Sequence, residues 1–353
     1  MKVVVLVPAH NEEASIGSTL EALEAQSRKP DLIVVIPNGC SDSTVEIARQ
    51  FPVVVLDLPA LAHRKSEALN TAWQLYAIDA GMVVTVDADT ELPPNAIGDW
   101  ELEMEAIDAL GGSSSKFTMQ QPGVLSRLQK AEFATWTDVS LRRKKTHVLA
   151  GTGCAIRGES LVAVSEIAGR PGPWSYESVT EDFELTYQIR RLGWFCHVSP
   201  TVRAYTDSMG TFTALWGQRM KWQVGTVEDL LRIGVNRLTL RDWFQQGLGL
   251  FSALLKALWL YVIFGALFLG IFQIIWIWWL IPLVFAAVDA KRAMRIPHRD
   301  RKDIVLASTF IFYEAFSWIR SAWFVASWIA VISSRITGIR VDRWKAQYIA
   351  EGV

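Results

Sequence analysis

The chain has 353 residues and a formal net charge of −1, and its composition is 51% hydrophobic and only 20% charged. The near-neutral balance argues against nucleic-acid binding through a large basic field, and three scattered cysteines are too few for a disulfide framework or a zinc site. The apolar excess is uneven, because eleven of the sixteen Trp residues follow residue 210.

The first 90 or so residues alternate short apolar runs with helical stretches. The runs are rich in β-branched residues, which is typical of parallel strands buried on both faces. We expect strands at Val3–Val7, Leu32–Ile36, Val53–Asp57 and Met82–Val86, and helices at Ala14–Gln26, Ser43–Gln50 and Lys65–Ala80. This order predicts a doubly wound, Rossmann-like α/β domain, whose ligands bind at the carboxyl ends of the strands.

A pair of acids, Asp87 and Asp89, follows the last of these strands. Two carboxylates at this spacing can bind a hard divalent cation, and such a cation would neutralise charge on a departing diphosphate. The alternative is a loop with two solvated acids. Lys65 begins a predicted helix, either as an ordinary exposed charge or as a ligand of an anion.

The sequence Thr180-Glu181-Asp182 predicts the first turn of a helix. One interpretation is structural, since a Thr N-cap followed by acids suits the helix dipole. The other makes Asp182 a general base that takes a proton from an attacking hydroxyl.

A long apolar stretch, Gly247–Val288, carries a single charge, Lys256. A bilayer core needs about 20 helical residues per crossing, so we expect two membrane segments, near 250–269 and 272–288. A third apolar stretch, 304–332, is interrupted by Glu314 and Arg320. It could be a tilted span or an interfacial helix followed by a short span, so we expect two to four segments in all. The basic loop Lys291–Lys302 predicts that this loop, and with it the N-terminal domain, is cytoplasmic.

The helical segment Gln218-Arg219-Met220-Lys221-Trp222 precedes the membrane region. It could anchor the chain at the interface through its cations and Trp, or it could take part in chemistry. The predicted organisation is therefore a domain at 1–210, juxtamembrane helices at 211–247, a membrane region at 248–334 and a basic tail at 335–353.

Three further motifs lie among those described above: Val7-Pro8-Ala9-His10-Asn11-Glu12-Glu13, Asn38 to Thr44 and Gly151 to Arg157. The set of motifs and their order along the chain resemble those of the family-2 glycosyltransferases. The resemblance is to the membrane-integrated branch that includes cellulose, hyaluronan and chito-oligosaccharide synthases. The resemblance covers about residues 3–225. It departs at Lys221, where the family motif usually has Arg, and lysine lacks the planar fork of arginine.

The resemblance implies a GT-A fold and inverting transfer of a sugar from a nucleotide diphosphate donor, usually a UDP-sugar, with Mg²⁺ or Mn²⁺. It makes Asp182 the catalytic base and Asp89 the metal ligand. It places the remaining residues in two groups. The donor group is Ala9, Asn11, Glu12, Asp42, Lys65 and Asp87, and the diphosphate and acceptor group is Gly153, Glu181, Gln218, Arg219 and Trp222.

The expected protein is a multi-pass enzyme of the plasma (inner) membrane with a cytoplasmic catalytic domain. Its expected partners are a nucleotide sugar, the lipid bilayer and a glycan, lipid or protein acceptor; no nucleic acid is expected, and a homo-oligomer is left open. Two alternatives are a protein glycosyltransferase at the membrane face and a catalytically silent membrane protein that binds nucleotide sugars.

Overall fold

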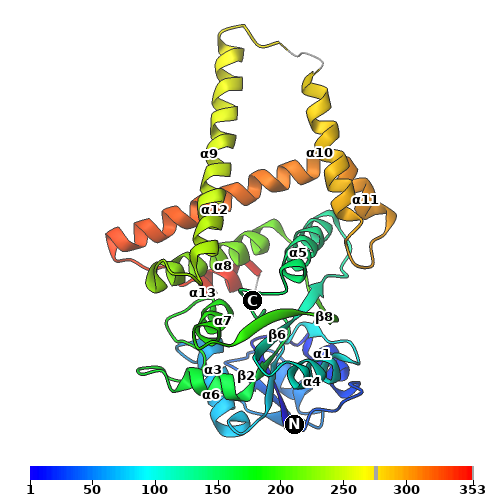
Figure 1. Ribbon diagram of the computed structural model, residues 1–353, viewed down its shortest axis with the longest axis vertical. Coiled ribbons are helices and arrows are strands. Elements are labelled where there is room, and N and C mark those ends of the chain that lie inside the picture. Colours follow the sequence, from blue (N-terminus) through cyan, green and yellow to red (C-terminus); the bar gives the residue numbers. More distant parts are fainter. Residues whose placement is uncertain (274–276, 352–353) are drawn as a thin grey trace. The chain divides into compact units, whose positions relative to one another are not determined.

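The computed structural model describes residues 1–273 and 277–351, which form two compact units (Figure 1). Unit 1 comprises Met1–Gln121 and Trp136–Ser208, and unit 2 comprises Pro122–Thr135 and Met209–Val353. The boundary passes through helix α5 (Val124–Arg143), so the first part of this helix belongs to unit 2.

Unit 1 is built on one eight-stranded sheet with the order β3-β2-β1-β4-β7-β6-β8-β5. The first four strands in this order are parallel, whereas β7 runs antiparallel to both β4 and β6. The strands are β1 (Val3–Ala9), β2 (Leu32–Pro37), β3 (Val54–Val55), β4 (Met82–Thr85), β5 (Thr90–Glu91), β6 (Leu110–Thr118), β7 (Cys154–Arg157) and β8 (Phe195–Thr206).

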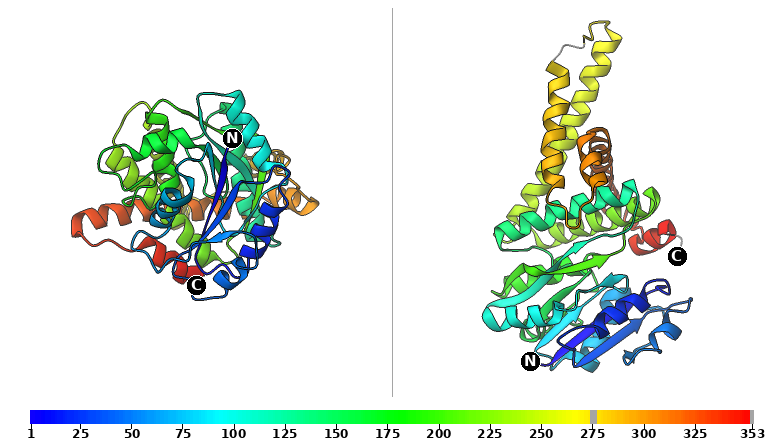
Figure 2. Two further views of the ribbon diagram at one scale, coloured as in Figure 1. Left: turned by 90° about the horizontal axis from the view of Figure 1, so that it is seen from below. Right: turned by 90° about the vertical axis from the view of Figure 1, so that its right-hand side faces the viewer.

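Both faces of the central strands are buried, as the continuous apolar runs predict. Alternate residues of β1 belong to different cores, with Val3 and Val5 on one face and Val4 and Leu6 on the other. Helices cover both faces (Figure 2). Residues of α1 (Ile16–Glu24) and α4 (Ala96–Ala106) pack on the first face, and those of α3 (Arg64–Ala72), α6 (Gly158–Ser165) and α7 (Glu181–Arg191) on the second.

Two expected elements of unit 1 differ in extent. The run Val53–Asp57 forms only the two-residue strand β3, which lies at the edge of the sheet and pairs with β2 alone. The expected helix Lys65–Ala80 begins as α3 and continues as a π-helical segment over Trp73–Ala77. Along the chain, β2 is followed by the short helix α2 (Thr44–Ala48) and then by β3.

Unit 2 is helical, and its core lies between α8 (Phe212–Ile233) and α12 (Ile311–Thr337). Buried Leu215 and Met220 belong to the same cluster as Phe316 and Trp323. The other helices of unit 2 are α9 (Leu240–Phe268), α10 (Ile277–Ala293), α11 (Arg301–Ser308) and α13 (Arg343–Glu351).

Among the described residues, α9 and α12 are long and apolar enough to cross a membrane. The expected segment 250–269 lies almost wholly within α9. The segment 272–288 includes residues 274–276, which lie outside the described residues, and α10 begins at Ile277. The segment 304–332 is divided between α11 and α12, with Phe310 at a φ of 58° between them. The predicted domain boundaries and the number of crossings stay predictions.

Candidate active site

The loops that follow β1 and β2 are joined by hydrogen bonds. The backbone N–H of Asn38 donates to the carbonyl of Ala9 at 3.0 Å, and that of Ser41 donates to the side-chain oxygen of Asn11 at 2.8 Å. Asn11 adopts a φ of 55°, a left-handed conformation that Asn tolerates better than most residues. The predicted donor residues Ala9 and Asn11 therefore lie at the carboxyl end of β1, beside the loop that follows the adjacent strand β2, where doubly wound folds bind ligands.

Two further predicted donor residues lie in the same pair of loops. Thr44 links them, since its hydroxyl donates to Asp42 at 2.5 Å and accepts from the backbone N–H of Glu12 at 2.7 Å. Burial would raise the pKa of Asp42, but hydrogen bonds from Thr44 and from the backbone of Glu13 lower it instead. Asp42 is thus an ionised carboxylate that fixes the shape of the loops.

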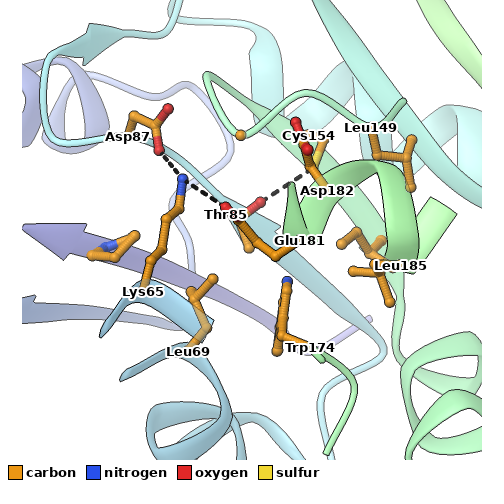
Figure 3. A pocket seen from close by; sticks show the side chains of 13 residues that line it. Lys65, Leu69, Thr85, Asp87, Leu149, Cys154, Trp174, Glu181, Asp182 and Leu185 are labelled. Atoms are coloured by element: carbon orange, nitrogen blue, oxygen red, sulfur yellow. Dashed lines mark hydrogen bonds and ion pairs between the residues drawn. The ribbon is translucent and has the colours of Figure 1, made fainter. Parts of the chain in front are cut away.

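Lys65, near the start of α3, extends into a pocket between β4 and α7 (Figure 3). Its ammonium lies 2.5 Å from Asp87 and 3.4 Å from Glu181. Burial disfavours the charge on Lys65, but these two carboxylates outweigh burial and raise its pKa. Lys65 is therefore a fixed cation, and the interpretation of an exposed helix-start charge is wrong because only 19% of its side chain is exposed.

Asp87 and Asp89 follow β4 and have different surroundings. Asp87 pairs with Lys65, whereas the Asp89 carboxylate accepts hydrogen bonds from the hydroxyls of Thr90 at 3.0 Å and Thr206 at 3.4 Å. Burial, together with the charge of Asp87, raises the pKa of Asp89 to about 7. The ionised form of Asp89 is consequently costly in the protein alone.

A bound divalent cation would offset the cost of ionising Asp89. No cluster of three or more His, Cys, Asp or Glu that could hold a metal occurs in the described part of the chain. Mg²⁺-type sites in nucleotide-binding enzymes commonly use only one or two carboxylates, with substrate phosphates completing the shell. The pair Asp87 and Asp89 fits such a site, in which the cation would compensate the charge on Asp89.

Asp182 lies in the first turn of α7 and lines the same pocket as Lys65 and Asp87. Its carboxylate accepts a hydrogen bond from the backbone N–H of Phe183 at 2.8 Å. Burial first, and then the charge of Glu181, raise the pKa of Asp182 to about 7. A carboxylate with a pKa near neutrality can serve as a general base at physiological pH.

Gly151 and Gly153 precede β7, and Gly151 lies beside these charges. A Cβ on Gly151 would lie 2.8 Å from the Lys65 ammonium, and one on Gly153 would lie 3.2 Å from Leu92. The absence of a side chain at Gly151 therefore leaves room for the Lys65–Asp87 pair.

Sequence reasoning missed Trp174, which lines the same pocket. Its backbone carbonyl accepts from the Asn70 side chain at 2.7 Å, and its backbone N–H donates back to Asn70 at 3.0 Å. A Cβ on Gly172 would lie only 2.5 Å from Asn70. The Pro- and Gly-rich sequence just before Thr180 marks this loop, but nothing local indicates its partner on α3.

The predicted residues Gln218, Arg219 and Trp222 lie on α8 in unit 2. They contact one another: the Arg219 guanidinium donates to the Gln218 side chain at 2.8 Å and lies 4.5 Å from the centre of the Trp222 ring. Lys221 lies over the ring of Trp344, 3.3 Å from its centre. These contacts do not test the roles that the resemblance assigns to the three residues, which stay predictions.

Comparison with known proteins agrees with the motifs. The model of the family described as "Glycosyltransferase like family 2" matches residues 2–225. The chain is 29% identical over 247 residues to the probable glycosyltransferase YdaM of Bacillus subtilis, an alignment that covers 65% of this chain and 56% of the relative. It is 24% identical over 270 residues to the poly-β-1,6-N-acetyl-D-glucosamine synthase of Staphylococcus aureus, covering 75% and 63%. The matches therefore span less than two thirds of either relative's length.

The fold is also similar to that of a solved structure, the mannosyltransferase PcManGT from Pyrobaculum calidifontis in complex with GDP-Man and Mn²⁺. The TM-score is 0.63 at 16% sequence identity, and the match covers 94% of this chain and 87% of the other. This likeness supports a GT-A fold. The family match shows more, because it spans residues 2–225 and so more than half of the chain: the chain belongs to the family-2 glycosyltransferases.

Proposed function

We propose that this glycosyltransferase moves a sugar from a nucleoside diphosphate donor to a hydroxyl of a membrane-proximal acceptor, with inversion at the anomeric carbon. The main support is one juxtaposition. A half-buried carboxyl with a pKa of about 7, Asp182, lines the same pocket as a fixed cation, Lys65, and the acid Asp87 that follows β4.

In the proposed step, the ionised Asp182 accepts the proton of the acceptor hydroxyl as its oxygen bonds to the anomeric carbon. The bond from that carbon to the diphosphate oxygen breaks, and the nucleoside diphosphate leaves with the electron pair. Inversion requires the base and the leaving group on opposite faces of the sugar, so Asp182 and the diphosphate must lie on opposite sides of the anomeric carbon.

Donor binding is assigned to the loops after β1 and β2 and to the acids that follow β4. Ala9, Asn11, Glu12 and Asp42 would line the nucleotide, with Lys65 and Asp87 beside the ribose and diphosphate. Asp89 would hold Mg²⁺ or Mn²⁺, which supplies positive charge against the leaving group when bound. PcManGT was solved with GDP-Man and Mn²⁺; for this chain the motif resemblance favours a UDP-sugar.

The acceptor is proposed to be a glycan or a lipid at the membrane. The named activity of the Staphylococcus aureus relative, synthesis of a β-1,6-linked N-acetylglucosamine polymer, favours a glycan over a protein. The apolar helices α9 and α12 support a location in a membrane, and the basic segment Lys291–Lys302 favours the cytoplasmic side for unit 1. Gly153 and Glu181, and on α8 Gln218, Arg219 and Trp222, are assigned to the diphosphate and acceptor on the strength of their motifs.

A donor panel tests this proposal. The purified full chain is incubated with UDP-N-acetylglucosamine, UDP-glucose, UDP-galactose or GDP-mannose, a bacterial membrane extract and Mn²⁺, and released nucleoside diphosphate is measured. We expect release from one donor, with loss of release in EDTA. Equal release with and without chelator would contradict the metal assignment, and no release from any donor would contradict the donor class.

A further inference from the structure

Unit 2 contains a buried carboxylate with an arginine at each oxygen. Glu132 lies on the first part of α5 and has 3% of its side chain exposed. Its Oε2 accepts a hydrogen bond from the Arg219 guanidinium of α8 at 2.9 Å, and its Oε1 lies 3.2 Å from Nε of Arg320 on α12. Glu132 therefore links three helices of the unit.

Arg219 lies against two neighbouring aromatic rings. Its guanidinium carbon lies 5.0 Å from the centre of the Phe133 ring and 4.5 Å from that of Trp222. The two rings are themselves 6.2 Å apart, with an angle of 53° between their planes. Because a guanidinium stacks on aromatic faces through its plane, the orientation of Arg219 constrains that of the Trp222 indole, which is only half-buried.

We propose that Glu132 is a positioning residue: by pairing with Arg219 it fixes the guanidinium against Trp222 and so holds this indole in place for the acceptor. The importance of the indole rests on the proposed function, in which Trp222 contacts the acceptor. The link through Arg320 also connects this arrangement to α12, a helix apolar enough to cross a membrane.

The physical reason is the cost of burying an unpaired charge. Arg219 is 4% exposed in its side chain, and burial lowers its pKa, whereas the charge of Glu132 acts in the opposite direction. Without the negative charge of that carboxylate the buried guanidinium costs more, which favours its movement toward water. That movement would take it from the face of Trp222, so the ring would lose the group that orients it.

The test compares Glu132→Gln with Asp303→Asn in the full chain. Asp303 is a matched control, because it is also a buried carboxylate with two cations from α5, Arg127 at 2.6 Å and Lys130 at 3.3 Å. Both substitutions thus remove a buried charge between two cations in unit 2, but Asp303 contacts neither Arg219 nor Trp222 in the described hydrogen bonds and ion pairs.

The first readout needs no substrate. The protein is labelled with 5-fluorotryptophan, and the ¹⁹F resonance of Trp222 is assigned as the one missing from Trp222→Phe. We expect this resonance to shift or broaden in Glu132→Gln and to be unchanged in Asp303→Asn. An unchanged Trp222 resonance in Glu132→Gln would overturn the inference.

The second readout is the ratio of labelled sugar transferred to nucleotide released, with the donor that reacts best in the panel above. Displacement of a positioning group by about 1 Å can cost roughly 10²-fold, so we expect the ratio to fall tenfold or more in Glu132→Gln and to stay constant in Asp303→Asn. A shifted Trp222 resonance with an unchanged ratio would leave the Glu132–Trp222 link standing and would contradict the acceptor role of Trp222 instead.

If Glu132→Gln does not accumulate in membranes, Arg219→Lys carries the same test. Lysine keeps a positive charge for Glu132 but lacks the planar group that stacks on the ring. The inference requires the Trp222 resonance to move in this variant as well, and an unchanged resonance would overturn it.

Discussion

Asp182 and Asp89 are half-buried carboxyl groups of unit 1, and the pKa of each rises to about 7. In both cases burial is the largest cause, and a neighbouring acid adds to it: Glu181 for Asp182 and Asp87 for Asp89. The two proposed roles use this property differently. A base works by taking up a proton as the hydroxyl attacks, whereas a metal ligand must remain ionised.

The first prediction concerns pH. Asp182 must be ionised to act as a base, and its raised pKa means that the protonated, inactive form predominates below about pH 7. We expect kcat/KM, which reports the free enzyme, to fall about tenfold per pH unit below that value. Steady-state kinetics from pH 5 to 8 at two Mn²⁺ concentrations checks this. Protons compete with Mn²⁺ for Asp89, so a fall in rate caused by Asp89 depends on the Mn²⁺ concentration. A fall caused by protonation of Asp182 does not. A flat profile would exclude Asp182 as the base.

The second prediction concerns Asp89→Ala. Without this carboxylate the diphosphate would meet the protein without its bridging cation, so we expect Mn²⁺ to stop enhancing UDP binding. Titration calorimetry with and without Mn²⁺ measures the effect. Asp79→Ala is the control, because Asp79 is exposed and pairs only with Lys2 in the described salt bridges. The same Mn²⁺ dependence in the Asp89 and Asp79 variants would remove Asp89 from the metal site.

At the level of elements, α8 presents different faces to different partners. One face carries Arg219 and Trp222 toward Phe133 of α5, and Trp216 lies at the core with α12, 6.3 Å from the Trp323 ring. Gly217 and Lys221 face α13, where a Cβ on Gly217 would lie 3.0 Å from Ala350. The departure from the family motif at Lys221 thus coincides with a contact to the C-terminal helix.

The third prediction compares two tryptophans of α8. Trp222→Ala should reduce transfer strongly, by up to about 10²-fold, because an indole offers a sugar an apolar face and its loss leaves the acceptor misplaced. Trp216→Ala should lower thermal stability, since Trp216 packs on Trp323, but should leave the ratio of transfer to nucleotide release unchanged. Activity and membrane fractionation of both variants check this. Equal loss of transfer would favour an anchoring role for both rings.

The fourth prediction concerns the two apolar helices. Lys256 of α9 donates hydrogen bonds to the carbonyl and hydroxyl of Ser317 at 2.7 Å and to the hydroxyl of Ser321 at 2.9 Å, both on α12. Interhelical hydrogen bonds in membranes contribute about 0.6 kcal/mol each on average. Lys256→Met should therefore lower the free energy of unfolding by about 1–2 kcal/mol.

Unfolding of the purified chain in mixed micelles measures this difference. Leu254→Met, at an exposed position of the same helix, is the control for introducing methionine. If the two variants have the same free energy of unfolding, the hydrogen bonds of Lys256 do not stabilise the packing of α9 on α12.

For the whole molecule, the local sequence predicted the centre of unit 1 well. The apolar runs of β1, β2 and β4 predicted strands buried on both faces, and the parallel arrangement brings their carboxyl ends to one edge. Polar residues at those ends therefore had to converge. The loops after β1 and β2 and the acid Asp87 after β4 could therefore be expected at one site, whereas Lys65 and Asp182, which lie on helices, were assigned to it by the motif resemblance.

Contacts between distant segments could not be predicted in this way. Asn70 and Trp174 are 104 positions apart, and a buried Asn on α3 has no pattern that indicates a loop as its partner. Likewise, Glu132 is one acid in an ordinary helical stretch, and only the packing of α5 on α8 shows that it meets Arg219. Periodicity reports which face of an element is buried, but not which side chain it meets.

The central claim is that Asp182 is the base for sugar transfer, and turnover of Asp182→Asn with the preferred donor tests it most directly. Asparagine keeps the shape of the side chain and an oxygen that can accept from the backbone of Phe183, but it cannot take the proton. The account predicts donor affinity within a few-fold of wild type and turnover reduced by about 10²–10⁴. Near-normal turnover in this variant would contradict it.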